Sequence, residues 1–250
     1  MKIILMKTKP LVSVVMSCYN ENQTFLELSV NSILSQSYRN FEFIIVNDKT
    51  SISNEFFLNK MEKKDSRIRV IKNFERLGLA QNLNKAISLS NGTYILRMDT
   101  DDLALKNRIK EQVEFMQKNP EVDIAGSNAY YIDESGNFIK KVKLVRKSNI
   151  YLNTMVIHPS VIGKKIFFTK NKYNPKLLRC QDFELWIRTF EENNITNIDK
   201  FLIKYRVKNR TFSQRFESFK YTSGIIFKHA LINNNIFNGI YALVFRSISF

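Results

Sequence analysis

The first half of the chain alternates short apolar runs with segments whose apolar residues recur at helical spacing. The runs that fit buried strands cover residues 11–16, 41–46, 68–72 and 93–98. Helical spacing is found in Leu26, Val30, Ile33 and Leu34, in Leu79, Leu83, Ala86 and Ile87, and in Ile109, Val113 and Met116. Parallel strands are joined by crossover helices that cover both faces of a sheet. The alternation therefore predicts an α/β fold with a mostly parallel sheet flanked by helices.

The pattern changes after Val122. Residues 122–132 and 138–145 predict two strands joined by the turn sequence Asp-Glu-Ser-Gly, and residues 181–192 predict a helix. An antiparallel pair of this kind would make the sheet mixed. Because no repeat or low-complexity linker interrupts the chain, we expect one domain over residues 1–210 and a helical C-terminal extension over residues 211–250.

Polar and acidic residues follow the predicted strands. Residues 17–21 read Ser-Cys-Tyr-Asn-Glu, Asn47 and Asp48 follow the second strand, and residues 99–102 read Asp-Thr-Asp-Asp. Ligands of open α/β sheets bind beyond the carboxyl ends of the strands, so these residues mark the expected site. Neither the G-x-G-x-x-G nor the G-x-x-x-x-G-K-[ST] pattern occurs, which disfavours a dinucleotide-dependent dehydrogenase and a P-loop NTPase.

The acidic segment Asp99-Thr-Asp101-Asp102 carries the sharpest chemical signal. Three carboxylates within four residues repel one another unless a cation lies between them. Carboxylate oxygens suit Mg²⁺ or Mn²⁺, especially when the phosphates of a ligand complete the coordination. The alternative is a solvated turn in which an Asp caps a helix beginning near Ala104. The position directly after a buried strand favours the metal site.

Six motifs in order give the chain a recognisable resemblance. They lie at residues 12–21 (VSVVMSCYNE), 43–48 (FIIVND), 73–82 (NFERLGLAQN), 97–102 (RMDTDD), 158–161 (HPSV) and 181–186 (QDFELW). Over about residues 10–210 the chain resembles family 2 glycosyltransferases of the GT-A (Rossmann-like) fold. It is especially similar to bacterial enzymes that build capsule, exopolysaccharide and lipopolysaccharide.

The resemblance implies inverting transfer of a sugar from a nucleotide-diphosphate donor, by family habit a UDP-sugar, to a hydroxyl of a saccharide acceptor. Residues 10–120 would bind the donor and residues 121–210 the acceptor. The donor contacts it implies in the first part are Ser17, Tyr19, Glu21, Asp48, Arg76 and Asp99. Tyr19 would stack beside the nucleobase, Asp48 would bind the base, and Asp99 would reach the ribose. Asp101 would ligate a divalent Mn²⁺ or Mg²⁺.

Two later positions match the acceptor side of the family's site. Asp182 matches the catalytic base, and it would lie in the first turn of the predicted helix at 181–192. The alternative is an Asp that only complements the helix dipole. Relatives often have Glu at the preceding position, where this chain has Gln181. His158 matches a position near the acceptor, although a structural histidine is the other interpretation.

One departure from the family bears on the metal. Many relatives carry a metal-binding His after the base helix, and Lys208 stands at the matching position here. A protonated lysine cannot ligate a metal, but it can pair with a diphosphate. Arg206, Lys208 and Arg210 would then form a cationic lid over the leaving group, or simply a solvated basic strand end. The departure makes metal dependence less certain than in those relatives.

The net charge of +16, from 39 Lys and Arg against 23 Asp and Glu, needs an anionic partner or a solvated surface. After Lys200 the one acidic residue is Glu217, and basic residues interleave with apolar ones. Residues 211–250 therefore predict basic amphipathic helices that either lie on an anionic membrane or pack on the catalytic domain. A membrane surface would suit a lipid-linked acceptor, so we expect a cytoplasmic protein, peripheral on the inner face of the cytoplasmic membrane.

Two features support that location. No apolar segment is long enough to span a membrane, and two cysteines cannot form a disulfide framework. The basic charge alone would also suit a nucleic-acid-binding module, but acidic clusters at strand ends disfavour a phosphate-binding groove. We therefore expect no nucleic-acid partner. A sugar nucleotidyltransferase, which also uses acidic metal sites, is the remaining alternative.

Overall fold

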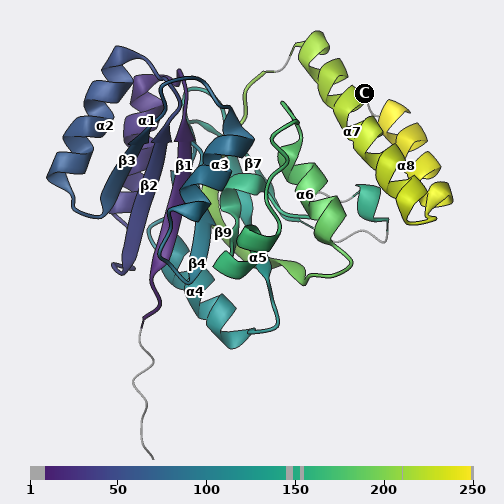
Figure 1. Cartoon of the computed structure of the whole chain (residues 1–250), viewed down its shortest axis with the longest axis horizontal. Coiled ribbons are helices and arrows are strands. Elements are labelled where there is room, and N and C mark those ends of the chain that lie inside the picture. The colour runs from purple at the N-terminus through teal and green to yellow at the C-terminus, as the bar shows by residue number, and fades with distance from the viewer. Residues whose placement is uncertain (1–8, 145–148, 153–154, 210, 249–250) are drawn as a thin grey trace, which may run out of the picture.

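A single mixed sheet organises the computed structural model, which describes residues 9–144, 149–152, 155–209 and 211–248 (Figure 1). Its strand order is β3-β2-β1-β4-β8-β6-β9-β5, and β7 pairs with β6 outside this path. The strands are β1 (Val12–Cys18), β2 (Phe41–Asn47), β3 (Ile68–Lys72), β4 (Tyr94–Arg97), β5 (Leu103–Ala104), β6 (Ile124–Ile132), β7 (Phe138–Val142), β8 (Ile162–Lys164) and β9 (Ile195–Arg206).

The first four strands form a parallel ladder, because β1 pairs in parallel with both β2 and β4, and β2 pairs in parallel with β3. β8 then runs antiparallel to β4 and β6, while β9 runs parallel to β6. The hairpin of β6 and β7 closes through a turn whose Gly136 has a φ of +89°. The predicted mixed α/β sheet and its antiparallel pair are confirmed.

Helices cover both faces of the sheet. The helices are α1 (Gln23–Leu34), α2 (Ile52–Lys64), α3 (Leu79–Ser88), α4 (Arg108–Lys118), α5 (Lys165–Lys170), α6 (Gln181–Thr189), α7 (Phe212–Ile232) and α8 (Ile236–Ile248). Short 3₁₀ turns lie at Ile150–Leu152 and His158–Ser160. One core cluster packs α1, α2 and α4 against one face, and a second packs α3, α5 and α6 against the other. Along β1, Val14 and Met16 belong to the first cluster and Val15 to the second, as strand alternation requires.

Several elements differ from the sequence expectations, among them β8 and α5, which were not predicted. α2 was not expected, since its buried Phe57, Leu58 and Met61 are interleaved with charged residues and with Phe56, which is 73% exposed. β9 was not expected either, because its lysines face outward between buried apolar residues and hide the strand pattern. The strand β5 occupies Leu103–Ala104, and the helix considered there begins only at Arg108.

The C-terminal helices α7 and α8 stand side by side at one end of the molecule (Figure 1). Ile226 and Ala230 of α7 and Ala242 of α8 form a third core cluster with Tyr151 and Ile187. The sequence left open whether these helices lie on a membrane or pack on the catalytic domain. The face that carries Ile226, Ala230 and Ala242 packs on the catalytic domain. Other apolar side chains of the pair are exposed, among them Phe227, Leu231, Phe237, Ile240 and Tyr241.

Within the described part of the chain, no helix combines the length and the hydropathy needed to cross a bilayer. The two cysteines, Cys18 and Cys180, are not joined in a disulfide. Burial raises the pKa of the Cys18 thiol to about 11, so it stays protonated and unreactive at neutral pH.

Candidate active site

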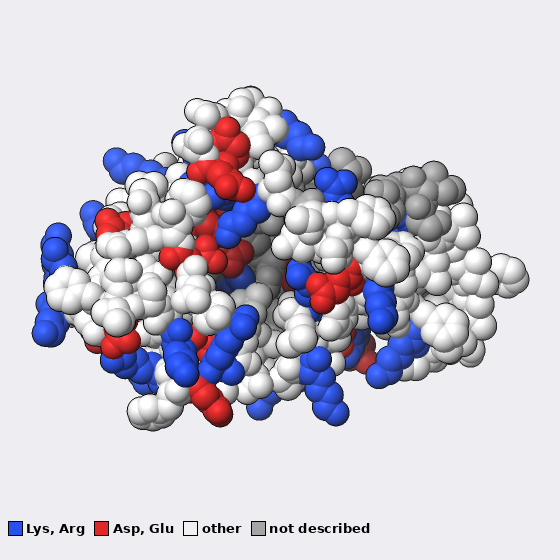
Figure 2. Space-filling model, turned by 90° about the horizontal axis from the view of Figure 1, so that it is seen from above, with Lys and Arg blue, Asp and Glu red and all other residues white. Residues whose placement is uncertain are grey.

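A cavity of about 380 Å³ opens at the carboxyl ends of the parallel strands. Its lining residues are Ser17, Tyr19, Glu21, Asp48, Arg76, Gly78, Leu79, Asp99, Thr100, Asp101, Tyr205, Arg206 and Lys208. Seen from above this edge, acidic side chains gather around a hollow in the middle of the molecule, with basic ones among them (Figure 2). Every predicted donor and metal residue in the described part of the chain thus lines one cavity. Arg210, also predicted, lies outside the described residues.

The turns after β1 and β2 aim side chains into this cavity. Asn20 and Lys49 follow these strands with φ values of +43° and +59°, the left-handed conformation that non-glycine residues rarely adopt. The side chain of Asn54 in α2 donates to the backbone oxygen of Glu21 at 2.8 Å, which joins the first turn to the helix after the second. Strained turns of this kind persist where surrounding contacts hold them, and they are common at functional sites.

Asp48 organises the loop at residues 73–78. Its Oδ1 accepts hydrogen bonds from the backbone N of Leu77 at 2.8 Å and from Asn73 Nδ2 at 3.0 Å, and its Oδ2 accepts from the backbone N of Gly78 at 2.9 Å. Burial acts to raise the pKa of Asp48, but these hydrogen bonds outweigh it and lower the pKa. The carboxylate is therefore charged at neutral pH and holds the loop against the end of β2.

Hydrogen bonds through Asn82 connect the end of β1 to the loop at residues 73–78. Asn82 Nδ2 donates to Ser17 Oγ at 2.9 Å, and Asn82 Oδ1 accepts from Asn73 Nδ2 at 2.7 Å. The guanidinium carbon of Arg76 lies 3.9 Å from the centroid of the Tyr19 ring. Arg76 therefore covers one face of the aromatic ring that the resemblance assigns to base stacking.

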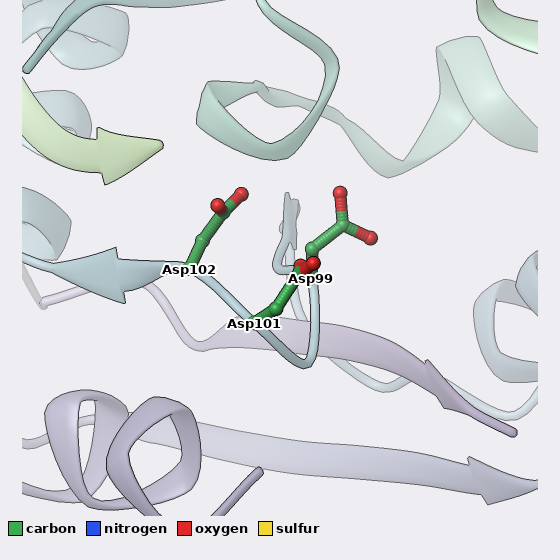
Figure 3. A group of neighbouring side chains, drawn as sticks. All are labelled: Asp99, Asp101 and Asp102. Carbon is green, nitrogen blue, oxygen red and sulfur yellow. The ribbon is translucent and has the colours of Figure 1, made fainter. Parts of the chain in front are cut away.

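The acidic turn between β4 and β5 lies on the floor of the cavity. Figure 3 shows the side chains of Asp99, Asp101 and Asp102 rising on one side of this turn. One ligand atom of each lies within 4.8 Å of the others. Asp99 forms an ion pair with buried Arg97, and Asp102 Oδ1 accepts from the backbone N of Arg206 at 2.7 Å. Burial, followed by the charges of Asp99 and Asp101, raises the pKa of Asp102 well above its ordinary value.

These residues fit a divalent cation. Asp102 Oδ2 is buried and has no hydrogen-bond partner among the described residues, an orphaned acceptor in an acidic cluster. Buried polar atoms are ordinarily satisfied, so this oxygen is available as a ligand to a cation. Three convergent carboxylates are the hard oxygen ligands that Mg²⁺ and Mn²⁺ prefer.

Two basic residues from the end of β9 reach the acidic turn in different ways. Lys208 Nζ lies 2.9 Å from Asp101 Oδ2 and 3.3 Å from Glu21 Oε2. Burial would lower the pKa of Lys208, but these two partners outweigh it and raise the pKa. Arg206 is 4% exposed, and its guanidinium donates to the backbone oxygens of Asp101, Asp133 and Glu134 at 2.8 to 2.9 Å. Arg206 thus joins the acidic turn to the turn between β6 and β7 at the wall of the cavity.

Asp182 and His158 are not among the residues that line this cavity. Asp182 lies in the first turn of α6, after Cys180 with a left-handed φ of +58°. Burial raises the pKa of Asp182, while the charge of Arg97 opposes the rise. His158 Nε2 lies 2.9 Å from the Tyr173 hydroxyl, and burial and then Arg97 keep the pKa of His158 well below its usual range. His158 is therefore neutral, and Arg97 links these residues electrostatically to Asp99.

Several residues of the site were not predicted from the sequence. Leu79, Thr100 and Tyr205 line the cavity without having been singled out as contacts. Arg97 was quoted only as part of a motif, yet it is the buried partner of Asp99. The signal for Arg97 was present, since a charged residue ends the apolar run Tyr-Ile-Leu. A buried charge needs a partner, and the nearby acidic residues supply one.

The sheet and the acidic turn beside a polar cavity fit a glycosyltransferase of the GT-A class. The chain belongs to glycosyl transferase family 2, whose family model matches residues 13–174. The family resemblance drawn from the sequence is thereby confirmed, and the chain is a glycosyltransferase. This assignment disfavours both alternatives, the nucleic-acid-binding module and the sugar nucleotidyltransferase.

Named relatives agree with this assignment. An uncharacterized glycosyltransferase of Methanocaldococcus jannaschii, MJ1057, is 39% identical over 210 residues, which cover 81% of this chain and 72% of the relative. The Escherichia coli enzyme WfgD is named a UDP-Glc:α-D-GlcNAc-diphosphoundecaprenol β-1,3-glucosyltransferase. It is 28% identical over 220 residues, or 84% of this chain and 83% of WfgD.

Solved structures share the fold at low identity. The 1–349 fragment of Staphylococcus aureus TarS in complex with UDP-GlcNAc superposes with a TM-score of 0.66 at 17% identity over 86% of this chain. The mannosyltransferase PcManGT of Pyrobaculum calidifontis, in complex with GDP-Man and Mn²⁺, gives 0.69 at 13% identity over 89%. This chain spans 66% and 64% of those two chains, and 39% of a longer TarS chain.

Proposed function

We propose that this protein transfers a sugar from a UDP-sugar to a hydroxyl of a lipid-linked saccharide, with inversion at the anomeric carbon. The cavity of about 380 Å³ carries the proposal, because it brings an acidic turn, two carboxylates at strand ends and a half-exposed lysine to one place. The names of WfgD and of the TarS complex, which specify UDP-linked sugars, support the choice of nucleotide. The name of WfgD also supports a lipid-linked acceptor.

The donor would lie along the carboxyl ends of β1, β2 and β4. Tyr19 and Asp48 would bind the base, with Ser17 beside them, and Asp99 would face the ribose. Arg76 already stacks on Tyr19 in the absence of donor. Donor binding would therefore close the 73–78 loop over the base without a large rearrangement of the loop. Because Asp48 holds the amides of that loop, the same carboxylate would couple base recognition to loop position.

Asp101, supported by Asp99 and Asp102, would hold Mn²⁺ or Mg²⁺. A bound divalent ion would neutralise charge on the departing nucleoside diphosphate. Lys208 would pair with the same diphosphate as a point charge. Arg206 would act by positioning, because its guanidinium donates to the backbone oxygens of Asp101 in the acidic turn and of Asp133 in the turn between β6 and β7. Arg210 remains a predicted contact of the diphosphate.

Asp182 would serve as the general base. One carboxylate oxygen would take the proton from the acceptor hydroxyl while that oxygen attacks the anomeric carbon. The new glycosidic bond forms as the bond to the diphosphate oxygen breaks, and that electron pair leaves with the nucleoside diphosphate. Burial raises the pKa of Asp182, which makes its carboxylate a stronger base. His158, neutral and bonded to Tyr173, would contact the acceptor from the neighbouring wall.

The exposed face of α7 and α8 would bind the inner face of the cytoplasmic membrane. Phe227 and Leu231 of α7 and Phe237 and Tyr241 of α8 present apolar surface. Figure 2 shows a largely uncharged surface at the end of the molecule where Figure 1 places these helices. Exposed Lys228 on α7 adds positive charge. Aromatic and basic side chains together suit the interface of an anionic bilayer, where a lipid-linked acceptor would be presented.

Product analysis tests the proposal. The full chain is incubated with UDP-glucose, UDP-GlcNAc, GDP-mannose and other nucleotide sugars in Mn²⁺, with undecaprenyl-diphosphate-linked acceptors. We expect UDP release that depends on the acceptor and a glycosidic product of inverted anomeric configuration. Release of pyrophosphate would instead identify a nucleotidyltransferase, and turnover with GDP-sugars alone would contradict the choice of nucleotide.

A further inference from the structure

The ammonium group of Lys208 lies at the place where a divalent cation would meet Asp101. Lys208 Nζ is 2.9 Å from Asp101 Oδ2, and the same nitrogen is 3.3 Å from Glu21 Oε2. Asp101 and Glu21 come from the ends of two neighbouring strands, β4 and β1, and Lys208 from the end of β9. Lys208 therefore connects the β1 side of the donor cavity to the acidic turn, and it does so by occupying an Asp101 oxygen that could ligate a metal.

The charges around the turn differ in their freedom to move. Arg97 is 2% exposed and paired with Asp99, so it is fixed in the sheet. Arg206 is equally buried, and three backbone oxygens hold its guanidinium. The Lys208 side chain is 48% exposed and follows the last residue of β9, outside regular secondary structure. Of these three cations, Lys208 alone has a side chain that can swing without unpacking the core.

We propose that Lys208 is a built-in counter-ion, which competes with the divalent cation for Asp101 and is released to the donor diphosphate. In the protein without donor, the ammonium group neutralises Asp101 and Glu21, and the divalent cation binds weakly. When the donor enters, its diphosphate attracts Lys208 away, and the freed Asp101 oxygen becomes available to the cation. The first half of the proposal stands on the ion pairs, and the second half rests on the proposed nucleotide-sugar donor.

Elementary electrostatics supports this exchange. A lysine has three donors and no acceptor, so it can satisfy Asp101 but cannot share a metal's coordination. Two like charges near one carboxylate repel each other, which lowers the affinity for the second cation. A diphosphate carries more negative charge than one carboxylate, and charge-assisted hydrogen bonds to phosphate are strong. Binding of donor and cation should therefore be mutually reinforcing, by the reciprocity of linked equilibria.

The test measures Mn²⁺ binding directly, through loss of the electron paramagnetic resonance signal of free Mn²⁺, with and without UDP. The full chain is compared with Lys208→Met, which keeps the side-chain length and removes the charge. Lys204→Met is the matched control, because Lys204 lies exposed on β9, four residues before Lys208, and belongs to none of the ion pairs among the described residues. We expect Lys208→Met without UDP to bind Mn²⁺ about tenfold more tightly than wild type, the effect of one nearby charge.

UDP should then tighten Mn²⁺ binding by the wild-type protein, and by a smaller factor in Lys208→Met, where no lysine remains to be displaced. Equal Mn²⁺ affinities for the wild type and Lys208→Met, or an equal gain in Lys204→Met, would overturn the proposal. Absence of Mn²⁺ binding in every protein would overturn it as well. Thermal melts of each variant show whether it is folded. Lys208→Gln serves as a second charge-removing variant if Lys208→Met does not fold.

The same data separate this inference from the proposed function. A tenfold gain in Lys208→Met without any UDP binding, by wild type or variant, would refute the UDP-sugar donor and leave the counter-ion role in place. UDP binding with no effect of Lys208→Met on Mn²⁺ affinity would refute the counter-ion role and leave the UDP-sugar donor in place.

Discussion

The carboxylate of Asp48 binds the backbone amide of Gly78 at 2.9 Å, across thirty residues of sequence. Gly78 stands at the N-cap of α3 with a φ of +83°, so this hydrogen bond fixes where the helix starts relative to the end of β2. Both residues line the donor cavity. The stability of this corner and the shape of the donor cavity thus depend on the same atoms.

Asp48→Asn should destabilise the protein by about 1–3 kcal/mol, because an amide replaces an oxygen that accepts from backbone N–H groups. The pKa of Asp48 is lowered in the folded protein. Its contribution to stability is therefore complete above the unfolded-state pKa and is lost as the pH falls through the folded-state pKa. Urea unfolding at pH 7 should show the full difference from wild type, and the difference should shrink under acidic conditions.

Asp199→Asn is the control for this measurement, because the Asp199 side chain is 77% exposed and pairs with Lys143 at the surface. It should change the unfolding free energy by about 0.5 kcal/mol or less. Equal effects of the two substitutions would contradict the role assigned to Asp48.

Gly78→Ala and Gly224→Ala should change stability in opposite directions. A Cβ on Gly78 would meet no atom within 4 Å, so the cost is the backbone conformation alone (φ +83°, ψ 166°, a region that is essentially restricted to glycine), about 1–3 kcal/mol. A Cβ on Gly224 is equally unobstructed, but Gly224 lies within α7, where Ala should stabilise by about 0.5–1 kcal/mol. Thermal melts of the two variants provide the comparison, and a loss in both would count against the backbone explanation.

Asp182→Asn should lower the transfer rate by about 10²- to 10⁴-fold, since the amide cannot accept the acceptor proton. Donor binding, followed by isothermal calorimetry with UDP, should stay within about twofold of wild type, because Asp182 does not line the donor cavity. Glu184→Gln removes the same charge from the same helix turn, where Glu184 pairs with Arg188, and should retain activity. Full activity in Asp182→Asn would remove the base assignment.

The pH profile tests Asp182 independently. Burial raises its pKa above the ordinary aspartate value of about 3.9. A base is active when deprotonated, so the rate should rise with pH through this raised pKa and level off above it. The acidic limb of kcat/KM should therefore lie at higher pH than for an ordinary aspartate, and a rate that stays flat down to pH 4 would contradict the assignment.

Membrane binding should depend on the exposed face of the C-terminal helices. Replacing Phe237 and Tyr241, which are 92% and 59% exposed, by Ser should reduce binding to phosphatidylglycerol vesicles by roughly tenfold or more, from the apolar area lost. Phe56→Ser is the matched control, since Phe56 is 73% exposed on α2 near the other end of the molecule (Figure 1). Equal vesicle sedimentation of all three proteins would exclude this face as the membrane contact.

The sequence predicted the parts of the fold whose pattern is local. β1 and β2 were recognised because nearly every residue in them is buried, which leaves an unbroken apolar run. α2 was missed because it buries only part of its surface, with charged side chains between its core residues. In β9, buried Leu202 and Ile203 lie between Lys200 and Lys204, and the lysines masked the strand.

In the candidate site too, residues marked by a local pattern were predicted and those placed by distant contacts were not. Asp48 and Asp99 were found because they directly follow strands, where the topology alone brings them together. The partners of Lys208 could not be read from sequence, since Asp101 and Glu21 lie far away along the chain and only the path of β9 brings the ammonium group to them. For Arg206 the sequence indicated only a positive charge. Its hydrogen bonds to the backbone oxygens of Asp101, Asp133 and Glu134 depend on the fold and could not be predicted.

The contact between Lys208 and Glu21 spans 187 residues and has a consequence for how the protein is made. Ribosomal synthesis proceeds from the N-terminus, so the acidic turn and the strands around it emerge well before β9 and its lysine. Until residue 208 leaves the ribosome, the nascent chain carries the carboxylates without Lys208 to cover them. Completion of the donor cavity is therefore a late event in biosynthesis, and a chain truncated within β9 would lack the lysine that pairs with Asp101 and Glu21.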